Sequence, residues 1–123
     1  AVDGWCDSPI LGHGFDSFKY LASYVLGKPW YSHCNYTEML YNGGIIMFAF
    51  YNWIYLKLFI KIKTNNCGST KYKSFASAIL ICMLIYDYSA VNYEDTFAQV
   101  LIAIAFTCIS LEEKERIDKR WGK

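Results

Sequence analysis

His33 is the residue of this sequence with the clearest capacity for chemistry. It lies about ten residues before a long apolar run, with Ser32 before it and Asn35 and Glu38 after it in a short stretch of helical character. A neutral imidazole accepts a proton near physiological pH, so His33 is a candidate general base. A capping or packing role without chemistry is the alternative. Ser32 is the residue expected to cap the helix that follows.

A glycine-containing loop is the second suggestive pattern. Its residues run Pro9-Ile10-Leu11-Gly12-His13-Gly14-Phe15. Gly12 and Gly14 permit positive φ angles and close approach of another backbone segment. An ordinary surface loop would show the same residues, and His13 between the two glycines has no further signal of its own. A second glycine pair, Gly43-Gly44, is expected to break the short helix that follows His33.

The five cysteines show no metal-ligand or redox spacing, so we expect neither a metal site nor another cofactor. Cys6 and Cys34 fall on the same side of the predicted arrangement and could pair, which the sequence leaves open. Cys82 and Cys108 lie within apolar runs, where cysteine behaves as a small hydrophobic residue. Cys67 lies in the polar segment between the first two runs.

Three apolar runs organise the rest of the chain and predict an all-α membrane arrangement. The expected transmembrane helices cover about residues 43–60, 74–91 and 96–111, preceded by an exterior segment 1–42 and followed by a basic tail 112–123. Only the first run meets the length of about 20 apolar residues that a span needs; the other two are short or interrupted. A soluble helical domain with uniformly apolar buried helices is the alternative.

The distribution of Lys and Arg between these runs predicts their orientation. The segment between the first two runs carries four lysines and the tail carries five basic residues, whereas the 87–95 link has three acids and no basic residue. Residues 1–42 contain only Lys19 and Lys28. By the positive-inside rule, the N-terminal segment and the 87–95 link lie outside a plasma or inner membrane, and the C-terminus is cytoplasmic.

Composition narrows the class of protein further. The chain has 123 residues, of which 54% are hydrophobic and 19% charged, and this balance excludes a disordered chain or a coiled coil. A sequence pI near 7.8 argues against nucleic acid as a partner. The first residues have neither a basic start nor an apolar run, so they do not form a signal peptide. We therefore expect the sequence to be the C-terminal piece of a longer membrane protein.

Three elements occur in order in the first half of the chain: the loop 9–15, the His33 stretch 31–40 and the glycine-containing start of an apolar run at 42–46. Over roughly residues 5–60 they resemble the O-antigen ligase and O-antigen polymerase family, which are bacterial polytopic glycosyltransferases with a large exterior loop between late transmembrane helices. The motif Asn35-Tyr36-x-Glu38 before Asn42-Gly43-Gly44 looks more like the polymerases.

The resemblance implies a reaction and a set of site residues. Family members transfer a glycan from a polyprenyl-diphosphate carrier to an acceptor glycan without a metal ion. His33 would act on the acceptor hydroxyl as a base or an orienting group. Asn35, Glu38, Gly12 and Gly14 would contact substrate.

The sequence departs from the family pattern at three places. Cys34 stands where asparagine is usual after the histidine, and Met47 stands where glycine is frequent. The first arginine is Arg116, in the tail, so the exterior arginines that hold the diphosphate would belong to an N-terminal part of the same enzyme. The chain given would then be inactive by itself. A small non-catalytic membrane subunit is the remaining alternative.

Overall fold

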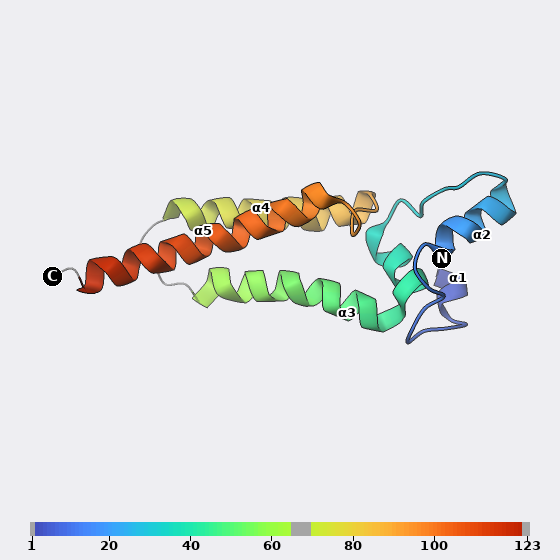
Figure 1. The fold of residues 1–123 in the computed structure, drawn as a ribbon, viewed down its shortest axis with the longest axis horizontal. Coiled ribbons are helices and arrows are strands. Elements are labelled where there is room, and N and C mark those ends of the chain that lie inside the picture. The colour runs from blue at the N-terminus through green and yellow to red at the C-terminus, as the bar shows by residue number, and fades with distance from the viewer. Residues whose placement is uncertain (1, 65–69, 122–123) are drawn as a thin grey trace. The chain divides into compact units, whose positions relative to one another are not determined.

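A computed structural model describes residues 2–64 and 70–121 of the chain. Every element of regular secondary structure in these two ranges is an α-helix, which confirms the predicted all-α class (Figure 1). The helices are α1 (Val2–Trp5), α2 (Ser17–Leu26), α3 (Asn35–Thr64), α4 (Thr70–Ser89) and α5 (Thr96–Trp121). Cys67 and the last two residues of the predicted tail lie outside the described residues.

The long helices extend beyond the predicted apolar runs. α3 begins at Asn35 rather than near residue 43, because the short helix after His33 joins the apolar run across a kink at Gly44. α5 continues to Trp121 because its last ten residues, although charged, include the strong helix formers Glu, Lys and Arg. The tail predicted from its charge is thus an extension of the last helix.

Two helical segments are long and apolar enough to cross a membrane, namely Asn35–Thr64 and Thr96–Glu115. Only 17% and 22% of their most apolar windows are buried within the protein. A core helix of a soluble domain would be mostly buried, so these values favour the membrane class over the soluble alternative. Both segments keep large apolar side chains on their surface, including Phe50, Trp53 and Ile104.

The chain divides into two compact units, which we describe separately. The first contains Ala1–Trp53 and Ile85–Glu94, and the second contains Ile54–Leu84 and Asp95–Lys123. In the second unit, small and branched apolar side chains form the core, with Leu58, Ala76, Ala105 and Ile109 fully buried. The Lys61 ammonium group donates a hydrogen bond of 2.8 Å to Ser110 Oγ, which ties α3 to α5.

The first unit is built around the break in α3. At Gly44 the backbone has φ 62° and ψ −163°, which no α-helix accommodates. In an unbroken helix the N–H groups of Ile45 and Ile46 would donate to the carbonyls of Tyr41 and Asn42, four residues earlier. The break removes both bonds and leaves two donors and two acceptors to be satisfied.

Residues 8–14, which we call the glycine loop, satisfy all four groups. Its N–H groups donate to the two released carbonyls, and its carbonyls accept from the two released N–H groups. The four bonds are His13 N to Tyr41 O (2.9 Å), Gly14 N to Asn42 O (2.8 Å), Ile45 N to Pro9 O (2.9 Å) and Ile46 N to Ile10 O (3.4 Å). Four intersegment hydrogen bonds therefore replace two helical ones.

This exchange requires glycine on both sides of the contact. Gly12 has φ 68°, and a Cβ there would lie 2.5 Å from the carbonyl carbon and oxygen of Asn42. Gly44 also has a positive φ, and a Cβ there would overlap the Ile10 carbonyl and lie 2.7 Å from Gly12 N. Of the two loop glycines predicted to allow close backbone approach, Gly12 does so against the start of the apolar run. A Cβ at Gly14, which has φ 104°, would have no atom within 4 Å.

We predict that Gly12→Ala strongly destabilises the first unit, whereas Gly27→Ala is a matched control. Gly27 has nearly the same φ, 70°, but a Cβ added there would have no atom within 4 Å. The control should cost about 1 kcal/mol from backbone strain alone. Gly12→Ala should cost roughly 2 kcal/mol more, because it also forces apart hydrogen-bonded backbones. Unfolding in mixed detergent micelles measures both, and equal losses would contradict the close-approach role.

Candidate functional site

His33 lies on an exposed turn immediately before α3. Its backbone has φ 56°, one of two positive φ angles at non-glycine residues in the described part of the chain. Such a conformation is uncommon outside glycine and is held only where the surroundings determine it. The imidazole contacts the Trp30 ring edge to face, with 6.2 Å between ring centroids. Its remaining surface faces outward.

The turn that carries His33 is held by buried and half-buried polar groups. Glu38 is 1% exposed, and its carboxylate accepts a 2.8 Å hydrogen bond from the backbone N–H of Ser32. Ser32 Oγ donates to the Cys34 carbonyl at 2.8 Å, and Thr37 Oγ1 donates to the same carbonyl at 3.1 Å. Ser32 therefore stabilises the turn rather than capping the first helical N–H groups. Glu38 supports His33 through the backbone.

Asn35 links the start of α3 to the 87–95 link. Its side chain is fully buried; Nδ2 donates to Asp87 Oδ1 at 3.0 Å. Its Oδ1 accepts from the backbone N–H groups of Asn92 and Tyr93, each at 3.1 Å. These contacts occupy its amide in a structural role, and substrate binding by Asn35 stays a prediction. Burial also makes Asn35 inaccessible to glycosylation in the folded chain, although Asn35-Tyr36-Thr37 has the sequon pattern.

Asn42, two helical turns after Asn35 and on the same face, makes a second set of links. Its Nδ2 donates to Tyr93 Oη at 2.9 Å, and its Oδ1 accepts from the backbone N–H of Phe18 at 2.9 Å. Burial raises the pKa of the Tyr93 hydroxyl well above its usual value, so this group remains a neutral hydrogen-bond partner. One asparagine thus connects α2, α3 and the 87–95 link.

Asn35, Asn42 and their bonding partners form one polar cluster. A third residue of α3 joins this cluster from beyond the break in the helix. Tyr51 Oη is 3.2 Å from both Asp87 Oδ1 and Asn92 Oδ1. A hydroxyl has one hydrogen, so Tyr51 donates to one of the two at a time. Asp87, the acid that interrupts the second apolar run, is fully buried against these partners.

The structure separates the predicted site residues into two groups. His33, Asn35 and Glu38 lie at the beginning of the helical arm 35–44. Gly12 and Gly14 lie beside its other end, at Asn42, which is seven residues or about 10 Å of helix from Asn35. The glycines therefore hold the far end of the arm that carries His33, and their predicted contact with substrate has no direct geometric support.

His13 and the cysteines have separate surroundings. His13 Nε2 lies 2.7 Å from the Gly4 carbonyl, and its ring stacks on Tyr41 with centroids 4.5 Å apart. No disulfide joins Cys6 to Cys34 in the structure. Among residues 2–64 and 70–121, no cluster of three or more His, Cys, Asp or Glu side chains is placed to hold a metal ion.

The sequence analysis named Asn35 but missed the other members of the polar cluster, which are Asn42, Tyr51, Asp87, Asn92 and Tyr93. Two signals could have found it. Asn35 and Asn42 share a helix face, and a single acid follows the second apolar run directly.

Comparison of the chain with protein-family models, with curated proteins and with solved structures found no match.

We predict that Asn35→Ala costs about 3 kcal/mol of unfolding free energy, because it leaves two buried backbone N–H groups and a buried carboxylate without their amide partner. Asn52→Ala is the matched control. Asn52 Nδ2 donates only to the Phe48 carbonyl of its own helix, so its loss should cost about 0.5 kcal/mol. Similar unfolding midpoints for the two variants in mixed micelles would refute the linking role of Asn35.

Proposed function

We propose that the chain is a multi-pass membrane protein in which α3, α4 and α5 cross the bilayer, with the N-terminal segment outside and the C-terminus in the cytoplasm. The loop charges support the orientation, and the apolar segments of α3 and α5 support two of the spans. α4 has 20 residues, which reach about 30 Å, the thickness of the hydrocarbon core.

Asp87 is the main obstacle to α4 as a span, and its surroundings reduce this obstacle. A charged group that faces lipid is costly, and acids within spans therefore pair inside the protein. Asp87 is fully buried and accepts hydrogen bonds from Asn35 and Tyr51. It also lies at the end of α4 that the orientation places near the exterior surface.

We further propose that the chain contributes to a glycosyltransferase that polymerises or ligates polyprenyl-diphosphate-linked oligosaccharides. One observation carries this proposal: the glycine loop and the glycine-containing start of the span, two of the three elements on which the family resemblance depends, form one hydrogen-bonded unit. The third element, His33, lies on the turn immediately before the helical arm that ends in that unit. Motif elements that fold together are better evidence than the same residues scattered over a surface.

In this mechanism the His33 imidazole removes the proton of the acceptor hydroxyl as its oxygen attacks the anomeric carbon of the donor sugar. The bond from that carbon to the diphosphate breaks, and polyprenyl diphosphate leaves with the electron pair. The leaving group is already good, so the main demands on the protein are deprotonation and placement. The buried Glu38 carboxylate accepts a hydrogen bond from the Ser32 N–H and so holds the exposed turn that carries His33. This arrangement supports placement of the imidazole.

Charge neutralisation of the diphosphate is proposed to come from arginines in another part of the same enzyme. Within residues 1–42, Lys19 is engaged by Asp16 at 3.8 Å and lies over the Tyr31 ring. The Asp16 carboxylate raises the pKa of Lys19 and holds it as a cation. A lysine shared in this way lacks the bidentate geometry that suits a diphosphate.

The small number of cations in residues 1–42 favours the second candidate function, a non-catalytic membrane subunit.

The membrane placement is tested by washing membranes that contain the chain with alkaline carbonate. We expect the chain to remain with the pellet, because removing two apolar helices with largely exposed surfaces from lipid is costly. A peripheral protein of the same membranes serves as the release control. Recovery of the chain in the supernatant would refute both membrane functions.

The catalytic role is tested by His33→Gly in the cell that makes the protein. Glycine removes the imidazole but suits the positive φ of this position better than any other residue, so folding of the turn should survive. We expect loss of long-chain surface polysaccharide, at least a 100-fold fall in transfer, with unchanged membrane content.

His13→Ala is the control for this experiment, because His13 lies in the glycine loop on a different turn. It should retain surface polysaccharide. Polysaccharide of normal length in the His33→Gly strain would remove His33 from the mechanism and favour the non-catalytic subunit.

A further inference from the structure

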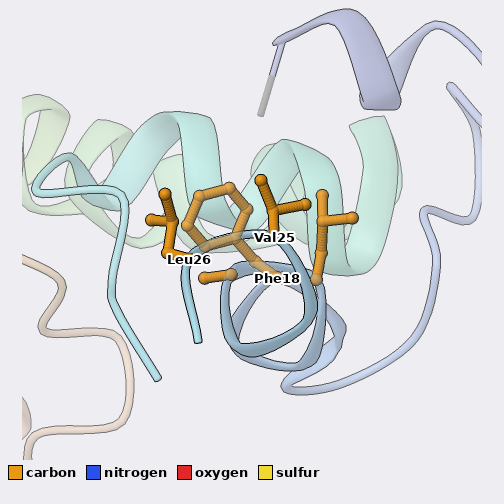
Figure 2. Close-up of a pocket in the computed structure, with 5 residues that line it drawn as sticks. Phe18, Val25 and Leu26 are labelled. Atoms are coloured by element: carbon orange, nitrogen blue, oxygen red, sulfur yellow. The ribbon is translucent and has the colours of Figure 1, made fainter. Parts of the chain in front are cut away.

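The apolar side chains of α2 form a continuous stripe that the protein covers only in part. The stripe consists of Phe18, Leu21, Ala22, Val25 and Leu26, at the spacing of one helix face, and these five line a pocket of about 180 Å³ (Figure 2). Ala22, in the middle of the stripe, is buried with 6% of its surface exposed. The C-terminal part of the stripe is uncovered, since Val25 is 66% and Leu26 is 64% exposed.

Hydrogen bonds within the first unit place the start of α2 beside the break in α3. The Phe18 N–H donates to Asn42 Oδ1, and the Phe18 ring packs edge to face against Tyr41 with centroids 5.4 Å apart. Tyr41 and Asn42 lie just before the kink at Gly44, where the apolar segment of α3 begins. The Phe18 end of the stripe on α2 is therefore anchored beside the start of that segment.

Residues around α2 have the composition of a membrane interface. Tyr20 and Tyr24 on its other side are strongly exposed, and Trp30 follows it with 49% of its surface exposed. Tyr and Trp rings favour the level of the lipid headgroups. Lys28, just after the C-capping Gly27, adds an exposed cation that complements anionic headgroups.

We infer that α2 is an interfacial helix that lies in the exterior leaflet, with Val25 and Leu26 inserted at the boundary between headgroups and acyl chains. The occupant of the uncovered stripe is phospholipid. Anchorage of the stripe beside the start of the apolar segment of α3, the aromatic surroundings and the lysine after the helix favour lipid over a protein partner. The inference rests on the membrane placement proposed above but not on the glycosyltransferase activity.

The unmodified full chain, reconstituted in vesicles of equal parts phosphatidylethanolamine and phosphatidylglycerol, provides the test. A trace of phospholipid with a photoactivatable diazirine in its acyl chain labels residues in contact with lipid, and mass spectrometry locates the adducts. We expect adducts on Val25 and Leu26 at several-fold the yield found on Tyr24. Phe50, which is 72% exposed on α3, is the internal control for a span.

The outcomes separate the two proposals. Adducts on Phe50 but none on Val25 or Leu26 would overturn the interfacial role of α2 and leave the membrane placement intact. Adducts on none of the three would overturn both. Leu26→Asp should lower the labelling of Val25 several-fold, whereas Tyr24→Asp on the other face should leave it unchanged. Equal effects of the two variants would count against insertion of the stripe.

Discussion

The exchange of backbone hydrogen bonds at Gly44 is the interaction on which the first unit depends. A helix can stop and restart at the edge of an apolar segment only if the released N–H and C=O groups find other partners. The glycine loop supplies two acceptors and two donors in the register that the break requires. This register determines where the loop lies, and the close approach explains why Gly12 and Gly44 lack side chains.

The helical arm 35–44 then organises the rest of the first unit from its two ends. Asn35 and Asn42 use one face of the arm to bind the 87–95 link through backbone and hydroxyl groups, and Asn42 also binds the start of α2. Buried polar atoms of segments far apart in sequence are hydrogen-bonded to one another, so each segment stabilises the others. His33 is exposed, but the turn that carries it is held by this buried framework through Glu38. The structure thus exposes the His33 imidazole and buries the groups that hold its turn.

Features of the fold that depend only on a short stretch of sequence were predicted well. The helical class and the break at the glycine pair were predicted from apolar length and from the backbone freedom of glycine. Two of the three predicted spans coincide with helices long and apolar enough to cross a membrane. The continuation of α5 through a charged tail was missed, because that prediction considered charge and not helix propensity. The prediction that Ser32 caps the following helix was also wrong, since its hydroxyl donates to the Cys34 carbonyl within the turn.

The sequence alone therefore determined which segments are apolar and where the chain can turn sharply, and it singled out His33 as a candidate for chemistry. Only the tertiary structure decided what the glycines and asparagines do. Gly12 meets Asn42 across 30 residues, and Asn35 meets Asp87 across 52. The type of a residue shows what bonds it can make, but its partner depends on which backbone groups remain unsatisfied after the helices form. Such pairings are properties of the packed chain, and no pattern within one segment contains them.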